Sequence, residues 1–413
     1  MKKVLIISYY FPPIGGVGTF RALKFSKYLG DFGWEPTVLS VQTSKFAPRD
    51  ETLVKDIPGT VRVRRTRSME SKVLSWGPMR LGINPKWVNI PDQYFGWYPF
   101  ALREALRITK EKRIDVVFAT APPYTSLLIA KTLKERLGIP FVIDFRDLWT
   151  ENFGIKYPTY LHRKFEEGLE ERIIDTANKV LVVSESNKRD LEKKYQGRLG
   201  SKVLTIPNGY DPSDFDRPVA TRPDKFVIAH VGSLYGSRIP VFFIEALKRS
   251  LQSTPSLRGD IQVIFMGKSS SELSGFVSKN GLNDVVREVP FSSHEDAISC
   301  MRSSSALLLI VGKEPGSEGA ISGKVYEYIA SARPIIATVP IPGDAAELIE
   351  RTKTGVAIHT DDVQGIERIL VDFYRRWKRG ELRSEPDSSE VQRYDRKLLA
   401  NRLAEVFNEV SRK

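Results

Sequence analysis

The strongest constraint on this chain is a pattern in which short, apolar, β-branched runs alternate with amphipathic stretches of helical period. Residues 4–9 form the first run, and their continuous apolar character is typical of a strand buried on both faces. Such alternation predicts a parallel sheet with helices on both faces, because each parallel crossover needs a helix. The first round predicts strands at residues 4–9, 37–41, 61–65, 116–120, 141–144, 180–184 and 202–206, and helices at 17–33, 98–113, 124–138, 158–178 and 185–195.

The pattern then restarts after residues 207–224, a stretch rich in Pro, Asp and Gly that is typical of a linker. The second round predicts strands at 226–231, 261–266, 285–289, 306–310, 334–338 and 355–358, and helices at 239–251, 271–281, 294–303, 322–332, 344–352, 362–378 and 389–411. We therefore expect an α/β protein with two Rossmann-like domains, residues 1–206 and 225–385, followed by a C-terminal helical segment, residues 386–413.

The composition excludes several classes of protein. The chain has 413 residues, of which 41% are hydrophobic and 27% charged, so it resembles soluble globular proteins and is long enough to bury two cores. Its one cysteine, Cys300, excludes an internal disulfide and a Cys-rich zinc site, and it suits a reducing cytosol. No apolar run approaches the roughly 18–20 residues of a membrane-spanning helix. We expect a cytoplasmic protein.

The net charge of +13 is unevenly distributed along the chain. Residues 1–200 contain 34 Lys+Arg and 22 Asp+Glu, a balance of +12, whereas residues 201–413 contain 29 and 28, a balance of +1. A one-sided basic excess suggests an anionic partner, which could be nucleic acid, acidic lipid or a phosphorylated ligand. Solvated surface charge is the alternative.

In open α/β sheets, ligands bind at the carboxyl ends of the strands, so the segments that directly follow predicted strands are the places to look for chemistry. Three such segments contain glycines: residues 12–18, 230–238 and 318–328. Glycine lets backbone N–H groups approach a ligand closely, and a helix N-terminus favours an anion. Segment 12–18 matches neither a G-x-G-x-x-G nor a Walker motif, and a tight turn explains it equally well.

Charged side chains accompany the second and third segments. Arg238 is placed to bind phosphate bidentately, with plain surface charge as the alternative. In the third segment, Ser322 is expected to cap the helix that follows and Gly323 to leave its first N–H groups accessible. Lys324 and Glu327 are three residues apart and share one helix face. They fit a phosphate-binding lysine with a ribose-binding glutamate, and they fit an ordinary ion pair equally well.

Four segments together resemble the family 4 retaining glycosyltransferases of the GT-B fold: YYFPPIGGVG, IPNGYD, HVGSLYGSR and SGKVYEYIASARPIIA. The likeness is greatest to the bacterial branch that builds surface polysaccharides, of the colanic-acid and O-antigen amino-sugar transferase type, and it covers nearly the whole chain. The resemblance implies a GT-B fold with an interdomain cleft and a C-terminal helix that crosses back to the first domain. It also implies a nucleotide-sugar donor, a UDP-sugar above all, with no metal and no other cofactor.

The resemblance also implies roles for individual residues. Arg238 and Lys324 would be the catalytic pair that neutralises the leaving diphosphate, and Glu327 would bind the donor ribose as the second glutamate of the family's E-x7-E motif. The other donor-binding positions would be Gly15, Gly16, Gly232, Ser233, Glu318, Gly319, Ser322 and Gly323. The first glutamate of E-x7-E falls on Gly319 in this chain, with Glu318 one place early. Either Glu318 or backbone N–H groups must then contact the transferred sugar.

The acceptor-side candidates follow two strands of the first domain. Thr120 begins TAPPY, which stands where many family members place a histidine, so Thr120 or the backbone must substitute for it. Asp144 and Asp147 in DFRDLW could orient an acceptor hydroxyl, although an ion pair between Arg146 and a carboxylate that holds the loop is equally expected.

No metal site is expected from the sequence. The four histidines are scattered, and the one D-x-D, at residues 214–216, lies in the linker and is interpreted as turn chemistry. Positive side chains would stabilise the departing phosphate in place of a cation.

Residues 72–98 mix aromatic and basic side chains, as expected for contact with a membrane interface near a lipid-linked acceptor. Buried loop packing is the alternative. The side chains concerned are Trp76, Met79, Leu81, Trp87, Tyr94, Phe95, Trp97 and Tyr98 among Lys72, Arg80 and Lys86, and the next helix adds Arg103, Arg107, Lys110, Lys112 and Arg113.

We therefore expect a retaining glycosyltransferase that moves a sugar from a nucleotide diphosphate to an acceptor hydroxyl, on a lipid-linked or polysaccharide precursor. The basic excess is assigned to the acceptor side, either the diphosphate-lipid head group or the anionic membrane, which leaves open a peripheral position on the cytoplasmic face of the membrane. A GT-B sugar-nucleotide 2-epimerase and a non-catalytic membrane- or nucleic-acid-binding module are the alternatives. No nucleic-acid partner is expected, because no signature of such binding occurs.

Overall fold

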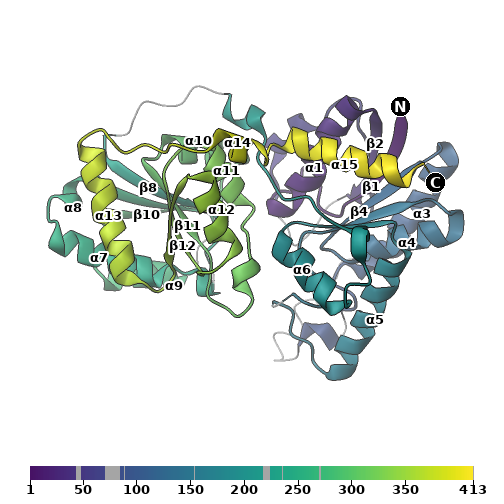
Figure 1. Ribbon diagram of the computed structural model, residues 1–413, viewed down its shortest axis with the longest axis horizontal. Coiled ribbons are helices and arrows are strands. Elements are labelled where there is room, and N and C mark those ends of the chain that lie inside the picture. Colours follow the sequence, from purple (N-terminus) through teal and green to yellow (C-terminus); the bar gives the residue numbers. More distant parts are fainter. Residues whose placement is uncertain are drawn as a thin grey trace. The chain divides into compact units, whose positions relative to one another are not determined.

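The computed structural model describes residues 1–42, 48–69, 84–87, 89–152, 154–216, 224–234, 236–268 and 271–412. The chain forms two compact units (Figure 1). The first unit contains Met1–Asn208 together with Arg396–Lys413, and the second contains Gly209–Asp395.

The first unit is built on a seven-stranded sheet of order β3-β2-β1-β4-β5-β6-β7, in which every neighbouring pair is parallel. The strands are β1 (Lys2–Ile7), β2 (Trp34–Val41), β3 (Arg62–Thr66), β4 (Val116–Ala121), β5 (Phe141–Phe145), β6 (Lys179–Val182) and β7 (Val203–Thr205). The helices are α1 (Val17–Tyr28), α3 (Tyr98–Glu111), α4 (Thr125–Leu137), α5 (Tyr160–Thr176), α6 (Glu185–Lys194) and α15 (Arg396–Val410).

The apolar run of β1 is explained by cores on both faces of this sheet. Successive side chains of a strand point to opposite faces. Leu5 and Ile7 belong to the core that includes residues of α3 and α4, while Val4 and Ile6 belong to the core that includes residues of α1 and α15. All four side chains are fully buried.

The C-terminal helix α15 packs on the first unit alongside α1 (Figure 1). Phe407 of α15 contacts Trp34 and Phe118 edge-on, with ring centroids 5.2 and 5.7 Å away. The predicted return of the C-terminal helix to the first domain is therefore confirmed.

The second unit repeats the architecture with a six-stranded parallel sheet of order β10-β9-β8-β11-β12-β13. The strands are β8 (Phe226–Val231), β9 (Ile261–Met266), β10 (Val286–Val289), β11 (Ala306–Ile310), β12 (Ile335–Val339) and β13 (Gly355–His359). The helices are α7 (Val241–Ser253), α8 (Leu257–Asp260), α9 (Ser271–Lys279), α10 (His294–Ser303), α11 (Lys324–Ala330), α12 (Asp344–Thr352), α13 (Val363–Lys378) and α14 (Ser388–Gln392). Both sheets therefore have the α/β, Rossmann-like arrangement that the strand–helix alternation predicts.

Two predicted helices differ from the structure by more than two residues at an end. The stretch predicted as one helix at 389–411 is two helices, α14 and α15, and α14 belongs to the second unit. The break has a local cause, because the Tyr210 amide donates to the Tyr394 carbonyl and Tyr210 pairs with Asp395 in a β-bridge. Helix α1 ends at Tyr28 rather than at Gly33, and a 3₁₀ turn, Leu29–Phe32, completes that stretch.

Each sheet has one place where the strand order reverses direction along the chain. In the first unit this switch point lies between β1 and β4, and in the second it lies between β8 and β11. In open α/β sheets the ligand binds at the carboxyl ends of the strands that flank the switch point. The loops after these four strands are therefore where the site is expected.

Candidate functional site

In the second unit, the loop after β8 contains the predicted donor residues Gly232 and Ser233. The Gly232 amide donates to the carbonyl of Met266, the last residue of β9, at 2.9 Å, and the loop then runs through a 3₁₀ turn, η7 (Gly236–Arg238). Arg238 and Ser233 are exposed, so the guanidinium and the hydroxyl both stand at the edge where β8 ends.

His230 lies beneath this loop at the end of β8. Its Nδ1 is 2.9 Å from the Leu308 carbonyl of β11, so the ring joins the two strands at the switch point. Burial lowers the pKa of His230 to about 4. A Cβ atom at position 232 would come within 3.0 Å of the His230 Nε2, which explains the glycine there. His230 therefore has the structural role that a strand-end histidine predicts.

Tyr328 connects helix α11 to the same loop. The Val231 amide donates to the Tyr328 hydroxyl at 2.7 Å, and burial raises the pKa of that phenol. Because α11 carries Lys324 and Glu327, this hydrogen bond holds both residues close to the end of β8. Tyr328 was missed in the sequence, since its partner lies 97 residues away along the chain.

Lys324 and Glu327 form the ion pair that their spacing allows. The Lys324 Nζ is 2.8 Å from the Glu327 Oε2, with 16% and 7% of the two side chains exposed. Burial raises the pKa of Glu327, but the charges of Lys324 and His294 outweigh burial and hold that pKa below its usual value. The carboxylate is therefore ionised, which is the state that accepts hydrogen bonds from hydroxyl groups.

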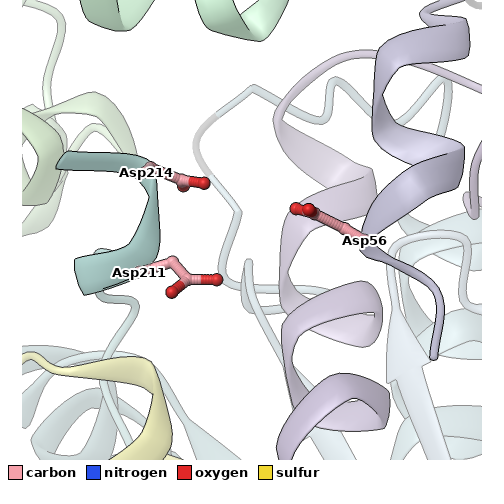
Figure 2. Close-up of side chains that lie close together, drawn as sticks. All are labelled: Asp56, Asp211 and Asp214. Atoms are coloured by element: carbon pink, nitrogen blue, oxygen red, sulfur yellow. The ribbon is translucent and has the colours of Figure 1, made fainter. Parts of the chain in front are cut away.

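His294 and Asp214 extend this pair into a chain of four charged or polar groups. The His294 Nε2 is 3.0 Å from the Asp214 Oδ2, and its Nδ1 is 3.9 Å from the Glu327 Oε1. Figure 2 shows Asp214 on the 3₁₀ turn η6 (Pro212–Phe215) and Asp211 at the cap position just before it, where Asp211 accepts from the Ser213 amide. The D-x-D segment thus forms a turn, as predicted, but Asp214 also holds a histidine that the sequence did not single out.

The remaining donor-side predictions lie between β11 and α11. Glu318 and Gly319 belong to a 3₁₀ turn, η8 (Ser317–Gly319), where Glu318 is exposed and Gly319 half-buried. Ser322 and Gly323 directly precede α11, and Gly323 occupies the cap position without a side-chain hydrogen bond. The expected Ser322 cap is therefore wrong in position: the Lys324 amide donates to the Ser322 hydroxyl, at a long 3.4 Å.

In the first unit, Gly15 and Gly16 form a turn between β1 and α1. Gly16 has φ of 90°, a conformation that favours glycine, so the tight turn weighed above is present. Gly15 is buried, its amide donates to the Pro48 carbonyl at 2.7 Å, and a Cβ there would come within 3.1 Å of the Asp50 Cβ. Both glycines stand at the β1 side of the switch point.

Asp144 and Thr120, predicted on the acceptor side, are internal. Asp144 has no exposed surface, and the Arg21 guanidinium contacts both of its oxygens, with Nη2 to Oδ1 at 2.7 Å and Nε to Oδ2 at 2.9 Å. Thr120 donates to the Asp144 Oδ2 at 2.6 Å and is 1% exposed. The acceptor role predicted for these two side chains is corrected: their polar atoms hold α1, β4 and β5 together inside the unit.

Arg146 holds backbone groups at the switch point. Its guanidinium donates to the carbonyls of Gly18, Ala121 and Pro122, and burial lowers its pKa. It therefore joins the first turn of α1 to the end of β4 at the switch point, which is a loop-holding role. Asp147 is exposed, unlike the other three acceptor-side candidates.

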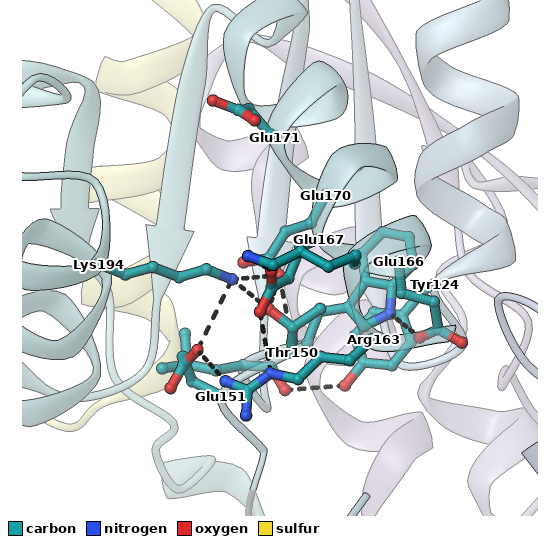
Figure 3. A network of polar contacts seen from close by, with 12 residues as sticks. Tyr124, Thr150, Glu151, Arg163, Glu166, Glu167, Glu170, Glu171 and Lys194 are labelled. Atoms are coloured by element: carbon teal, nitrogen blue, oxygen red, sulfur yellow. Dashed lines mark hydrogen bonds and ion pairs between the residues drawn. The ribbon is translucent and has the colours of Figure 1, made fainter. Parts of the chain in front are cut away.

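The chain beyond Asp147 is fixed by two buried carboxylates of α5 (Figure 3). Glu170 accepts from the Thr150 hydroxyl and from the Lys194 ammonium, the latter at 2.9 Å. Glu166 accepts from the Trp149 indole N–H at 2.8 Å. This network ties Trp149 and Thr150 to α5, and through Lys194 to α6.

The aromatic residues of segment 72–98 do not all fit one interpretation: one of them is buried in the core, and others are exposed as contact with a membrane would require. Trp97 is fully buried and donates to the Thr66 hydroxyl, so it packs in the core. Trp87 and Phe95 are 51% and 47% exposed. Lys72, Trp76, Met79, Arg80 and Leu81 lie outside the described residues.

Comparisons with known proteins agree with this architecture. The family model described as Glycosyltransferase Family 4 matches residues 14–214, and the one described as Glycosyl transferases group 1 matches residues 225–375, so together they span most of the chain. The chain belongs to the family 4 glycosyltransferases. The first match lies in the first unit except for its last six residues, and the second lies within the second unit.

Individual relatives of this family 4 glycosyltransferase are distant. A D-inositol 3-phosphate glycosyltransferase of Streptosporangium roseum is 23% identical over 403 residues, which cover 91% of this chain and 86% of that protein. Two solved structures share the GT-B fold: a sucrose-phosphate synthase of Thermosynechococcus elongatus (TM-score 0.70, 15% identity, 99% of both chains) and HepE of Anabaena in complex with UDP and glucose (TM-score 0.66, 16% identity, 99% of this chain and 100% of that one).

Among the described residues, no helix of this family 4 glycosyltransferase has both the length and the apolar character that crossing a membrane would require.

Proposed function

We propose that this glycosyltransferase transfers a sugar from a nucleoside diphosphate sugar, a UDP-sugar above all, to an acceptor hydroxyl with retention of configuration. The observation that carries the proposal is the switch point between β8 and β11. There the exposed Arg238 follows one strand, and the Lys324–Glu327 pair follows the other. Two cations and an ionised carboxylate at one edge match a diphosphate attached to a ribose. The complex of HepE with UDP and glucose supports the same donor class.

Each side chain has a distinct task in this proposal. Arg238 and Lys324 neutralise the charge that grows on the diphosphate as the sugar leaves, so the reaction needs no metal ion. Glu327 accepts hydrogen bonds from the ribose hydroxyls. Backbone N–H groups at Gly232 and Ser233 add donors for phosphate oxygens, and Glu318 and Gly319 contact the transferred sugar.

Retention follows if the acceptor hydroxyl attacks from the face that the diphosphate leaves. The bond from the anomeric carbon to the phosphate oxygen breaks, and a new bond forms from that carbon to the acceptor oxygen. The acceptor proton passes to the departing phosphate, so no separate general base is needed. In this proposal Asp147, whose side chain is exposed, orients the acceptor.

A transfer assay tests the proposal. The protein is incubated with labelled UDP-, GDP- and ADP-sugars and with lipid-linked acceptors. We expect label in the lipid fraction, with the anomeric configuration of the donor. An epimerised donor would indicate the 2-epimerase instead, and neither product with any donor would contradict the assignment.

Glu327→Gln is expected to weaken nucleotide binding by about 10-fold or more, because a hydrogen bond to a charged group contributes roughly 1.5–3 kcal/mol. Calorimetry with UDP and 2′-deoxy-UDP measures the effect on the wild type and the variant. The wild type should prefer UDP, and Glu327→Gln should lose most of that preference. Glu350→Gln, at an exposed position of α12, serves as the control. An unchanged preference for UDP would remove the ribose role.

The acceptor is proposed to be lipid-linked, with the basic first unit in contact with an anionic membrane. The exposed Trp87 and Phe95 are suited to a membrane interface, and α3 and the residues after it add three exposed guanidinium groups, at Arg103, Arg107 and Arg113. Residues 1–200 have a balance of +12, so nearly all of the net positive charge lies in this part of the chain.

Raising the salt from 0.1 to 1 M is expected to release the protein from vesicles that contain phosphatidylserine, because the screening length falls from about 10 to about 3 Å. Binding of UDP should change much less. Replacing Arg103, Arg107 and Arg113 by alanine should weaken vesicle binding by about 100-fold, at roughly 1 kcal/mol per charge. The matched control replaces Arg249, Arg258 and Lys279, which are exposed in the second unit. Equal losses from both triple variants would argue against the membrane contact.

A further inference from the structure

We propose that His294, fixed by Asp214, is a positioning residue that holds Glu327 in the orientation needed to accept from the donor ribose. This inference rests on the proposed function, in which Glu327 binds the ribose. It assigns a task to two residues that lie 80 positions apart in the sequence and that belong to none of the three glycine-containing segments.

The orientation of the His294 ring is set by Asp214. A carboxylate can only accept a hydrogen bond, so the 3.0 Å contact with the Asp214 Oδ2 requires the proton on the His294 Nε2. The other nitrogen, Nδ1, is then turned toward the Glu327 Oε1, 3.9 Å away. His294 is also the first residue of α10, whose cap Ser293 accepts from the Asp296 amide, so the backbone below the ring is fixed as well.

The His294 ring is buried, so the orientation that Asp214 gives it also restricts the neighbouring Glu327 carboxylate. The side chains of His294 and Glu327 are 6% and 7% exposed, and that of Asp214 is 14% exposed. Such a small exposed fraction leaves the imidazole little room for another rotamer while Asp214 holds Nε2. Removing the ring would leave space next to the Glu327 Oε1, and the carboxylate would then gain rotational freedom.

The two oxygens of Glu327 are held in different ways. Lys324 contacts Oε2 at 2.8 Å, whereas His294 stands beside Oε1. In the proposed reaction Lys324 also serves the diphosphate, so its ammonium is shared between two anions when the donor is bound. The imidazole contacts no phosphate in this scheme, and it maintains the position of the carboxylate while Lys324 is shared.

A purely structural role for His294 makes a different prediction. If the Asp214–His294 bond only anchored η6 to α10, its loss would lower the thermal stability and leave the preference for a ribose over a deoxyribose unchanged. A positioning role predicts that removing the His294 ring raises the KM for the donor and lowers the preference for a ribose over a deoxyribose, while kcat changes little.

The experiment compares His294→Ala, His294→Gln, Asp214→Asn and Glu327→Gln in the full chain, with UDP, GDP and ADP as probes and 2′-deoxy-UDP as the ribose test. We expect His294→Ala to weaken binding of the preferred nucleotide about 3- to 10-fold, the cost of immobilising on binding a Glu327 side chain that the imidazole no longer holds in place. His294→Gln should recover part of the loss, since its amide can still donate to Asp214. His359→Ala, which removes an exposed histidine that is also paired with an aspartate, Asp361, should bind as the wild type does.

A double-mutant cycle separates positioning from independent effects. Positioning requires that His294→Ala cost little once Glu327 is already glutamine, so the two losses should not add. Additive losses, or a lower melting temperature with wild-type affinity and ribose preference, would overturn the inference. If Glu327→Gln weakens the nucleotide and His294→Ala does not, the inference alone fails. If the wild type binds none of the three nucleotides, the proposed function fails and the inference fails with it.

Discussion

Replacing Lys324 by alanine is expected to lower the turnover of the nucleotide sugar by about 100-fold or more, the usual loss when one preorganised group that stabilises developing negative charge is removed. The Lys324 side chain is 16% exposed and stands at the carboxyl edge of the second sheet, where partial burial strengthens its interaction with the leaving diphosphate. Arg238→Ala is expected to act in the same direction and by less, because the guanidinium is exposed and screened by solvent. Turnover is measured as release of UDP at a saturating donor concentration.

The control for this experiment is Lys279→Ala. Lys279 is exposed on the last turn of α9, and in a parallel α/β unit the last turn of a helix lies at the amino edge of the sheet, away from the ligand. Wild-type turnover is expected for this variant. Because Lys324 also pairs with Glu327, its removal leaves a partly buried carboxylate without its nearest cation, so the melting temperature is recorded in parallel. Wild-type turnover of both Lys324→Ala and Arg238→Ala would contradict the assignment of the phosphate site.

The sheet architecture was predictable from the sequence because it depends on local patterns. The fully buried run at β1 and the strand-end position of Gly232 follow from hydrophobicity and glycine placement over a few residues. The spacing of Lys324 and Glu327 equally fixes their ion pair, since residues three apart on a helix share one face. Patterns of this length contain enough information to locate the edge of each sheet where a ligand is expected.

The contacts that complete the site were not predictable, because they join residues far apart in the chain. His294 approaches Asp214 across 80 positions, and Tyr328 approaches Val231 across 97. Asp144 illustrates the reverse error. In the sequence, a carboxylate after a strand resembles a ligand-binding group. Asp144 instead binds the guanidinium of Arg21, which is 123 positions away in the chain. This contact can be seen only when α1 is packed on the sheet.

Asp144→Ala is expected to destabilise the first unit by about 3–5 kcal/mol, the range found when one partner of a buried ion pair is removed. Arg21 is 1% exposed, so without Asp144 its charge would be left uncompensated in the interior. The remaining acceptors are uncharged: Arg21 donates to the carbonyls of Ile206 and Pro207, each at 2.8 Å, and to the Asn208 Oδ1 at 3.4 Å. Dipoles of this kind replace only part of the attraction of a full negative charge.

The measurement is urea unfolding of the whole chain followed by tryptophan fluorescence, in which Trp34, Trp97 and Trp149 report on the interior of the first unit. With a slope of roughly 2–3 kcal/mol per molar for a unit of this size, the midpoint of the transition that these residues report should fall by about 1–2 M. The control is Glu171→Ala, which breaks the pair between Glu171 and Arg198; these side chains are 50% and 45% exposed, so the midpoint should stay close to that of the wild type.

A double replacement, Arg21→Met with Asp144→Leu, separates the lost charge balance from the lost packing. It removes both charges and keeps similar side-chain volumes, so it should recover most of the stability that Asp144→Ala loses, because no buried charge remains unpaired. Thr120 would still lose its acceptor, a cost of about 1–3 kcal/mol that sets the limit of the recovery. If Asp144→Ala instead kept the wild-type midpoint and lost only acceptor turnover, the carboxylate would belong to the acceptor site after all, and the buried ion pair would not be what joins α1 to the sheet.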